Sequence, residues 1–213
     1  MKRPKKGSAI LTVGLTGVLG CGKTTVLSYF KKAGCRILSA DVLVHQELEH
    51  NKVLQQKLKR AFGADIFSRG NIAPERLACR GFASRKNLNR LNRIIHPVVK
   101  KKIVDFLRHG RRRSGISVAE IPLLFEAKMS SLFDCTVGVT VRPEVLGQRL
   151  QKHSRLSRRD IQKRMRWQMS AGEKLSRCDF IIDNSRTLTN TRRQVKELMK
   201  ILKTQGGVKR GKS

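Results

Sequence analysis

The stretch GVLGCGKTTV at residues 17–26 follows directly on the apolar run ILTVGLT at residues 10–16. It fits the pattern G-x-x-x-x-G-K-[ST], which ends here in Gly-Lys-Thr at residues 22–24. Phosphate oxygens accept hydrogen bonds, so a loop that wraps them must turn its backbone N–H groups inward. Glycine permits the positive φ angles and the close approach that this requires. Because a strand precedes the pattern and a helix follows it, the stretch predicts a phosphate-binding loop.

The residues from Lys23 to Lys32 read as a helix, whose N-terminus adds partial positive charge beside the phosphates. Lys23 can reach the β- and γ-phosphates of a nucleotide, and the Thr24 hydroxyl can ligate Mg²⁺, which is the cofactor we expect. Cys21 lies at the same helix N-terminus, a position that lowers the pKa of a thiol. An oxidation-sensitive thiol and a small residue at a variable loop position are both open interpretations of Cys21.

Short apolar segments rich in Val and Ile recur between helical patterns along the chain. They lack alternation of polar and apolar residues, which is typical of strands that are buried on both faces. Strands that alternate with helices favour an α/β fold, in which a parallel sheet has helices on both sides. The expected strands are Ile10–Thr16, Arg36–Ser39, Ile116–Ile121, Thr136–Val141 and Phe180–Asp183.

The connection between the second and third strands is too long for one crossover helix. It contains two helical patterns, over Val42–Phe62 and Leu88–Leu107, and Pro97 predicts a break or kink in the second. We therefore expect a single domain over residues 9–204, with a helical insertion at about 42–112. An arginine-rich helical patch at about 143–170, a last helix from about Thr191 and flexible basic tails at 1–8 and 205–213 complete the organisation.

The chain has a large excess of positive charge. Its 47 lysines and arginines against 15 aspartates and glutamates give a net charge of +32, spread over the whole sequence. This predicts nonspecific, salt-dependent binding to polyanions. One Trp, one Tyr and eight Phe accompany the basic residues without an aromatic RNA-binding motif, so no specific nucleic-acid partner is expected.

Five scattered cysteines without a C-x-x-C pair disfavour a disulfide framework and a zinc site, and they favour a reducing compartment, the cytoplasm. No apolar stretch reaches 18 residues, so we expect no membrane span. The basic and apolar N-terminus lacks a small-residue cleavage site and is not expected to be a signal peptide.

Phosphoryl transfer requires a group that orients or deprotonates the acceptor hydroxyl. Asp41 follows the second strand at the carboxyl edge of the sheet, where open α/β sheets bind ligands. It is either the base that acts on this hydroxyl or the N-cap of the helix expected from Val42. Glu120 ends the third strand and is either a contact of the Mg²⁺ shell or part of a surface salt bridge, which also explains Glu126.

The arginines of the basic patch can form a mobile lid over the transferred phosphate, because a guanidinium bonds phosphate oxygens in pairs. A solvated helix face is the alternative. His96 lies before Pro97 in an apolar helical pattern, which by itself indicates a structural histidine. The arginines of the patch are Arg149, Arg155, Arg158, Arg159, Arg164 and Arg166.

Taken together, these motifs resemble the dephospho-coenzyme A kinase family over residues 10 to about 202. The motifs in chain order are VGLTGVLGCGKTTV, SAD, IIHPVV, IPLLFE, a segment that ends in RWQ, and FIIDN. Many kinases share the phosphate loop, but HP followed by PLLFE at this distance is more specific. The resemblance implies a P-loop kinase-like fold with a helical acceptor-binding insertion and an arginine-rich lid. It also implies transfer of the ATP γ-phosphate to the ribose 3′-hydroxyl of dephospho-CoA, the last step of coenzyme A synthesis.

The resemblance assigns roles to matching positions. Asp41 becomes the general base near the acceptor hydroxyl, and His96 and Pro97 belong to the part that receives the CoA moiety. Arg149 and Arg155 match lid arginines. The ATP-binding positions are Gly20, Cys21, Gly22, Lys23, Thr24, Thr25, Arg149 and Asn184, with Lys23 also catalytic and with Thr24 and Glu120 expected at the metal.

Two positions depart from the family pattern. Ser39 stands where the family often has a first aspartate before the catalytic one, and Pro74 stands where it usually has an arginine, with Arg76 two residues later. Two other functions remain open from the residues alone. One is a P-loop kinase for a different small molecule, such as a nucleoside or nucleotide, and the other is a basic nucleic-acid-associated NTPase.

Overall fold

The computed structural model describes residues 10–110, 115–153, 161 and 165–205. The chain forms two units, each with its own dense internal packing. The first, which we call the sheet unit, consists of Met1–Ser39 and Val104–Ser213, and the second, the helical unit, consists of Ala40–Ile103. The domain boundaries expected from the sequence stay predictions.

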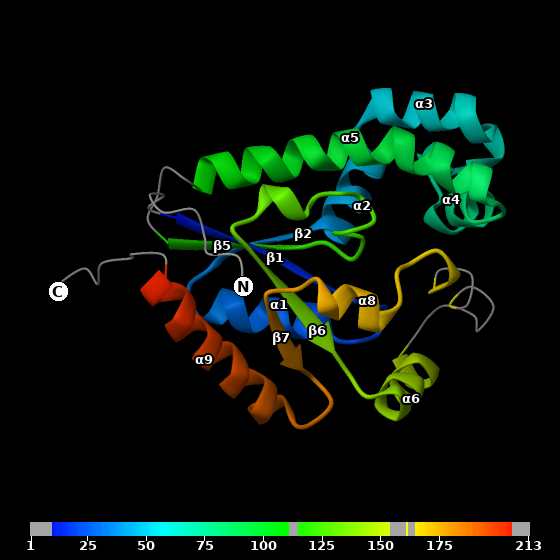
Figure 1. Cartoon of the computed structure of the whole chain (residues 1–213). Coiled ribbons are helices and arrows are strands. Elements are labelled where there is room, and N and C mark those ends of the chain that lie inside the picture. Colours follow the sequence, from blue (N-terminus) through cyan, green and yellow to red (C-terminus); the bar gives the residue numbers. More distant parts are fainter. Residues whose placement is uncertain (1–9, 111–114, 154–160, 162–164, 206–213) are drawn as a thin grey trace. The chain divides into compact units, whose positions relative to one another are not determined.

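A five-stranded parallel sheet forms the centre of the sheet unit (Figure 1). Its strand order is β2-β5-β1-β6-β7, so the strand that leads into the phosphate loop lies in the middle. All the strands expected from the sequence are present within one residue of their expected ends, which confirms the α/β class. They are β1 (Ile10–Gly17), β2 (Arg36–Ser39), β5 (Gly115–Glu120), β6 (Cys135–Thr140) and β7 (Phe180–Asp183).

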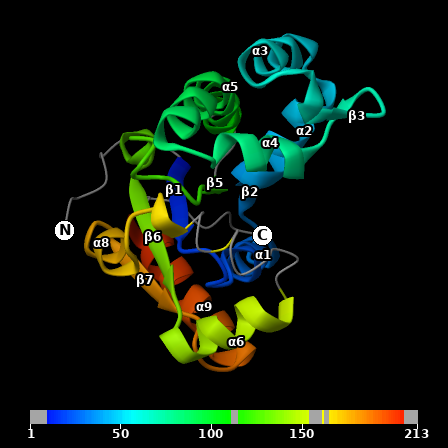
Figure 2. The ribbon, with the colours of Figure 1, turned by 90° about the vertical axis from the view of Figure 1, so that its right-hand side faces the viewer.

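Helices cover both faces of this sheet. On one face, α1 (Lys23–Lys32) and α9 (Leu188–Gln205) enclose a core with alternate residues of the strands, such as Val137 and Val139 of β6 (Figures 1 and 2). Gly138 points to the other face, where a Cβ atom would lie only 2.8 Å from Leu175 Cδ2 of α8 (Ala171–Ser176). Because helices cover both faces of the sheet, the strand sequences do not alternate between polar and apolar residues.

Two further helices of the sheet unit follow from local sequence signals. Pro143 begins α6 (Pro143–His153), as expected for a proline in the first turn. A capping box begins α8, since Ser170 Oγ accepts a hydrogen bond from the Glu173 N–H and the Glu173 carboxylate accepts one from the Ser170 N–H. In sequence, Ser157-Arg-Arg-Asp160 also fits a capping box, but this stretch lies outside the described residues.

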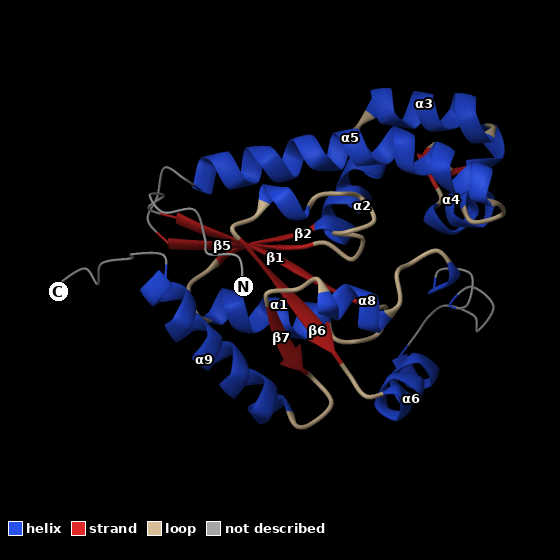
Figure 3. Cartoon of the chain, in the orientation of Figure 1, coloured by secondary structure: helices blue, strands red, loops and turns tan. Residues whose placement is uncertain are grey.

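The helical unit consists of helices and one short hairpin (Figure 3). Its apolar core includes Leu54, Leu58, Ile66 and Leu77. The last turns of its long final helix belong to the sheet unit. The elements are α2 (Ala40–His50), α3 (Lys52–Phe62), the 3-10 helix η1 (Ala64–Ile66), β3 (Phe67–Ser68), β4 (Asn71–Ile72), α4 (Pro74–Gly81) and α5 (Arg85–Gly110).

The structure refines two expectations for these helices. The pattern over residues 42–62 is not one helix, because Asn51 separates α2 from α3 and caps α3 by accepting a hydrogen bond from the Leu54 N–H at 3.0 Å. The helix does not break at Pro97, since α5 continues through this residue, and the alternative of a kink stays a prediction. Pro97 is exposed, so the backbone carbonyl that loses its helical partner can bond to water.

Of the helices that the structure describes, none combines the length and the apolar character that a membrane span requires.

Candidate active site

The phosphate loop connects β1 to α1 at the carboxyl edge of the sheet. Gly20 and Gly22 have φ angles of 79° and 87°, which glycine adopts without the strain that other residues pay. A Cβ atom on Gly20 would lie 2.9 Å from Leu146 Cδ1 of α6, and one on Gly22 would lie 2.1 Å from Asn184 Nδ2. Both positions therefore favour glycine, because their φ angles are positive and because side chains of other segments approach their backbone closely.

Lys23 is the first residue of α1 and is only 8% exposed. Its Nζ donates a hydrogen bond of 3.0 Å to the carbonyl oxygen of Val18, so the side chain folds back along the loop. An ammonium group has three donors, and a buried one needs charged or polar partners. Phosphate oxygens held by the loop would supply such partners, which suits the role expected for Lys23.

Thr24 and Glu120 form a second polar pair beside the loop. The Thr24 hydroxyl donates a hydrogen bond of 3.4 Å to Glu120 Oε1. Glu120 ends β5 next to the central strand and is 3% exposed. A hydroxyl and a carboxylate are the hard oxygen ligands that Mg²⁺ prefers when substrate phosphates and water supply the rest of its shell. These two residues therefore fit a magnesium ion.

Cys21 is buried within the phosphate loop. Burial raises the pKa of its thiol, and the positive charge of Lys23 offsets this effect only in part. The expectation of a lowered thiol pKa is therefore wrong, because the desolvation of a thiolate outweighs its attraction to nearby positive charge. The structure favours the alternative, in which Cys21 is a small residue that fills the loop.

Asn184 directly follows β7 and is buried under the loop. Its Nδ2 donates a hydrogen bond of 2.9 Å to the carbonyl oxygen of Cys21, and its Oδ1 accepts one of 2.8 Å from the Thr191 hydroxyl of α9. Arg149 of α6 donates from Nη2 to the backbone oxygen of Asn184 at 2.9 Å. Asn184 thus connects the phosphate loop to three elements that are distant in sequence.

A pocket of about 470 Å³ opens beside the loop. Its volume lies within the range of small-molecule sites, which are mostly apolar with a few polar groups. Leucines and glycine backbone form much of its lining, and Arg149 and Asn184 supply polar groups. The residues that line it include Leu19, Gly20, Gly22, Thr25, Leu150 and Leu188.

A buried ion pair in the sheet unit was not expected from the sequence. Lys174 of α8 is 1% exposed, and its Nζ lies 3.0 Å from Glu126 Oε1 and donates to the Pro122 carbonyl oxygen at 2.6 Å. Glu126 Oε1 also accepts a hydrogen bond of 2.9 Å from the Met169 N–H. Glu126 is thus not in a surface salt bridge; it joins the turn after β5 to the chain that precedes α8. The lysine follows a capping box, but nothing in the local sequence predicts its burial.

Three expected site residues belong to the helical unit. Asp41 is exposed in the first turn of α2, which begins at Ala40, so the alternative of an N-cap before Val42 is wrong. His96 lies half-buried in α5, where burial lowers the pKa of its imidazole and keeps the ring neutral at neutral pH. Pro97 follows it on the same helix.

The departure at Pro74 also has a structural account. Pro74 is the first residue of α4, a position that favours proline. Arg76 donates from Nη1 to the carbonyl oxygens of Asp65 and Phe67 at 3.2 and 3.0 Å. It therefore supports the hairpin backbone of the helical unit.

Within the sheet unit, the structure brings together most of the expected nucleotide-binding residues. Arg155, Arg158, Arg159 and Arg164 of the expected lid lie outside the described residues. The catalytic, binding and metal roles stay predictions for the following positions: Gly20, Cys21, Gly22, Lys23, Thr24, Thr25, Asp41, His96, Pro97, Glu120, Arg149, Arg155 and Asn184.

The chain is similar in sequence and in fold to known proteins. Residues 11–190 match the family model described as dephospho-CoA kinase. A dephospho-CoA kinase of Bacillus licheniformis is 34% identical over 194 residues, which cover 89% of this chain and 95% of the relative. The crystal structure of TT1252 from Thermus thermophilus has a TM-score of 0.75 at 28% identity and covers 94% of this chain and 99% of its own. A dephospho-CoA kinase from Campylobacter jejuni shares the fold, with a TM-score of 0.60 at 20% identity and coverage of 92% and 98%.

The parallel sheet, the phosphate loop after its central strand and the residues gathered around that loop define a kinase of the P-loop class. Within this class the chain belongs to the dephospho-CoA kinase family. Its activity is that of a dephospho-CoA kinase in coenzyme A biosynthesis. The P-loop kinase-like fold and the dephospho-CoA kinase activity implied by the motifs are thereby confirmed, in preference to the two alternatives left open by the sequence, and the arginine-rich lid stays a prediction.

Proposed function

We propose that this kinase transfers the γ-phosphate of ATP to the ribose 3′-hydroxyl of dephospho-CoA and releases ADP and coenzyme A. The observation that carries the proposal is the phosphate loop, with Lys23 folded along it and a pocket of about 470 Å³ beside it. The match to the family over residues 11–190 supports dephospho-CoA as the acceptor. The cytoplasm is the compartment that we propose for this reaction, in keeping with cysteines that are scattered along the chain.

On the ATP side, backbone N–H groups of Gly20 to Thr25 would bind the phosphates, and Lys23 would bind the β- and γ-phosphates. Arg149 would add a guanidinium that bonds phosphate oxygens in pairs. Thr24 and Glu120 would hold Mg²⁺, which neutralises charge on the phosphates when it is bound. Support comes from the Thr24–Glu120 contact and from the place of Arg149 at the pocket.

On the acceptor side, Asp41 would take the proton of the ribose 3′-hydroxyl. The hydroxyl oxygen then bonds to the γ-phosphorus as the bond to the β–γ bridging oxygen breaks, and ADP leaves. Asp41 comes two residues after Ser39, which ends β2 and pairs in register with Glu120. His96 and Pro97 would belong to the surface that receives the CoA moiety, and Arg149 and Arg155 would close as a lid.

The reaction is tested by incubating the protein with ATP, Mg²⁺ and dephospho-CoA and following coenzyme A by its mass. We expect product that requires dephospho-CoA, while adenosine and common nucleotides stay unphosphorylated. Lys23→Ala is expected to abolish turnover and Lys57→Ala, an exposed lysine of α3, to leave it unchanged. Equal turnover by the Lys23→Ala variant would contradict the ATP assignment, and phosphorylation of adenosine in place of dephospho-CoA would contradict the acceptor.

The role of Asp41 has its own test. Asp41→Asn is expected to lower kcat by about 10²–10⁴ because the general base is lost. Glu49→Gln removes an exposed carboxylate from the same helix and serves as the control. If Asp41→Asn reduces only the free energy of unfolding and leaves kcat unchanged, another group takes the proton.

A further inference from the structure

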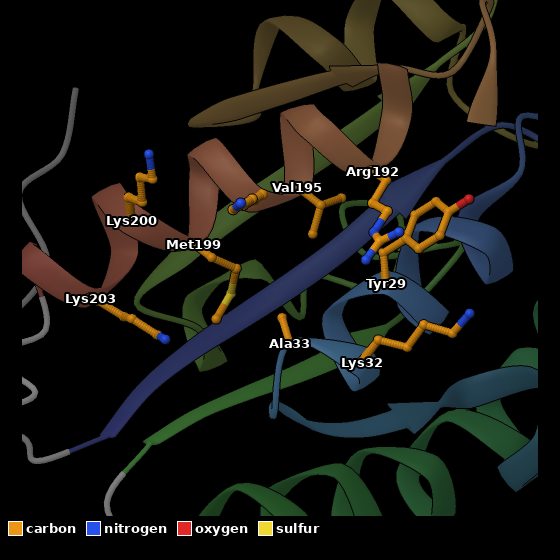
Figure 4. A pocket seen from close by; sticks show the side chains of 9 residues that line it. Tyr29, Lys32, Ala33, Arg192, Val195, Met199, Lys200 and Lys203 are labelled. Carbon is orange, nitrogen blue, oxygen red and sulfur yellow. The ribbon is translucent and has the colours of Figure 1, made fainter. Parts of the chain in front are cut away.

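A second pocket lies between α1 and α9, and we call it the α1–α9 pocket. Its volume is about 330 Å³, and Figure 4 shows side chains from both helices around it. It shares no lining residue with the pocket beside the phosphate loop. The loop precedes the first residue of α1, whereas Tyr29, Lys32 and Ala33 lie at the other end of this helix or just beyond it. The site is therefore separate from the nucleotide site.

The charge around this pocket has one sign. Its cations are Lys32 on α1 and Arg192, Lys196, Lys200 and Lys203 on α9, and no carboxylate of the described residues lines it. The only acid in the sequence of α9 is Glu197, whose Oε1 lies 4.0 Å from Arg193 Nε.

The spacing of these cations on α9 is unfavourable for the helix itself. Arg192, Lys196 and Lys200 are four residues apart, so like charges stand next to one another along one ridge. Such a concentration of one charge around a hollow attracts anions strongly. A bound anion would remove the repulsion that the free pocket carries.

The remaining lining is apolar and aromatic. Val195 and Met199 are buried at 2% and 5% exposure, and Ala33 lies beside them in the lining. Tyr29 is half-buried, and Lys32 Nζ lies 6.0 Å from the centroid of its ring. A solvated basic helix face needs neither a hollow nor such a lining. The combination suits a ligand that has several phosphates and a flat group able to pack on a phenol ring.

We propose that the α1–α9 pocket binds a nucleoside polyphosphate at a site outside the phosphoryl-transfer centre. Lys196, Lys200 and Lys203 bind its phosphate oxygens, and Arg192 bonds a phosphate through two N–H groups. The base packs against Tyr29 and the apolar side chains. This proposal does not rest on the identity of the acceptor in the transfer reaction.

Tyr29 offers a readout confined to this pocket, because it is the only tyrosine in the chain. Protein made with 3-fluorotyrosine has one ¹⁹F resonance, which is followed while ADP or pyrophosphate is added at near-physiological salt without Mg²⁺. The Lys23→Ala variant provides a background in which binding at the phosphate loop is weakened. We expect a saturable shift of the resonance in this background, with ADP bound more tightly than pyrophosphate.

Two double variants test whether ADP binds in the α1–α9 pocket. Lys196→Ala with Lys200→Ala is expected to weaken ADP binding about tenfold or more, because two charge-assisted contacts are lost. Lys57→Ala with Lys59→Ala removes the same charge from exposed positions of α3 and is expected to change the binding little. Circular dichroism of each variant shows whether the fold is retained.

The proposal is overturned if no saturable shift appears, or if both pairs of substitutions weaken binding equally, since the effect would then be general electrostatic attraction. Equal binding of pyrophosphate and ADP would overturn the assignment to a nucleoside polyphosphate. A shift that a short RNA produces and ADP does not would overturn it as well, because the surface would then bind nucleic acid.

Discussion

The side-chain amide of Asn184 donates a hydrogen bond of 2.9 Å to the carbonyl oxygen of Cys21, across 163 residues of sequence. The same side chain accepts a hydrogen bond from Thr191 of α9. A phosphate loop has to present N–H groups to its ligand, so its carbonyl groups must find partners elsewhere. The end of β7 supplies one of these partners and fixes the path of the loop.

Asn184→Ala is expected to raise the KM for ATP and to lower the free energy of unfolding by about 1–3 kcal/mol, because the Cys21 carbonyl loses its side-chain donor and the Thr191 hydroxyl loses the nearer of its two acceptors. Urea unfolding and steady-state kinetics measure the two effects. Asn89→Ala, an exposed asparagine of α5, is the control. A fall in stability with an unchanged KM would show that Asn184 supports the fold without positioning the loop.

Gly22→Ala should impair the site far more than Gly34→Ala, although both glycines have nearly the same φ angle, 87° and 86°. Each substitution carries the strain of a positive φ, of the order of 1 kcal/mol. The new Cβ of residue 22 meets Asn184 Nδ2 at 2.1 Å, whereas at residue 34 it would have no atom of the described part of the chain within 4 Å, its chain neighbours aside. Calorimetric titration with ADP compares the two variants, and equal loss of binding in both would contradict this account.

Lys174→Met is expected to lower the free energy of unfolding by about 3–5 kcal/mol, because it leaves Glu126 without its buried charged partner. Adding Glu126→Leu should recover part of the loss. Arg193→Ala breaks the exposed pair with Glu197 and should cost less than about 1 kcal/mol. Thermal unfolding measures all three, and a loss in Lys174→Met no larger than that in Arg193→Ala would argue against a stabilising role for the buried pair.

The stability of the helical unit should depend on pH through Glu47. Burial raises the pKa of this carboxyl group, but hydrogen bonds from Asn51 and Lys102 and the charge of Lys102 outweigh this effect and leave the pKa below its ordinary value. A lowered folded-state pKa means that the stabilisation is present above the unfolded pKa of about 4.3 and is lost as the pH falls through the lower folded value.

Glu47→Gln should therefore be less stable than the parent protein at pH 7, by about 1 kcal/mol, and the difference should shrink as the pH falls below about 4. Urea unfolding at a series of pH values measures this difference. Glu49→Gln, an exposed neighbour on α2, should show a much smaller one. A difference that is constant over the pH series would contradict the role of the Glu47 charge.

Local patterns account for what the sequence predicted correctly about the fold. The five strands are short runs of buried apolar residues between helices, and α1 follows directly from the phosphate-loop motif. The break at Asn51 was missed because the apolar pattern continues across it, and only the hydrogen bond to Leu54 shows that the residue acts as a cap. The short hairpin of β3 and β4 has too few residues to show alternation.

In the candidate site, too, some features could be predicted from local sequence patterns and others could not. The glycines, Lys23 and Thr24 are adjacent in sequence, so their pattern is visible without a structure. Distant segments of the chain produce the burial that raises the thiol pKa of Cys21, and they also supply the partners of Lys174. No local sequence pattern predicts either feature. The sign of the Cys21 shift depends on how much water the fold excludes, which the helix N-terminus alone does not determine.

The pairing of β2 with β5 affects how the protein folds. Ser39 and Glu120 are partners in neighbouring strands, yet the whole helical unit is synthesised between them. Closing such a long stretch of chain costs entropy before any strand hydrogen bond forms, whereas contacts within the helical unit close shorter stretches of chain. We therefore expect the helices to collapse early and the β2 edge of the sheet to be completed late, so that the strand edge of β5 is exposed to aggregation in the partly folded protein.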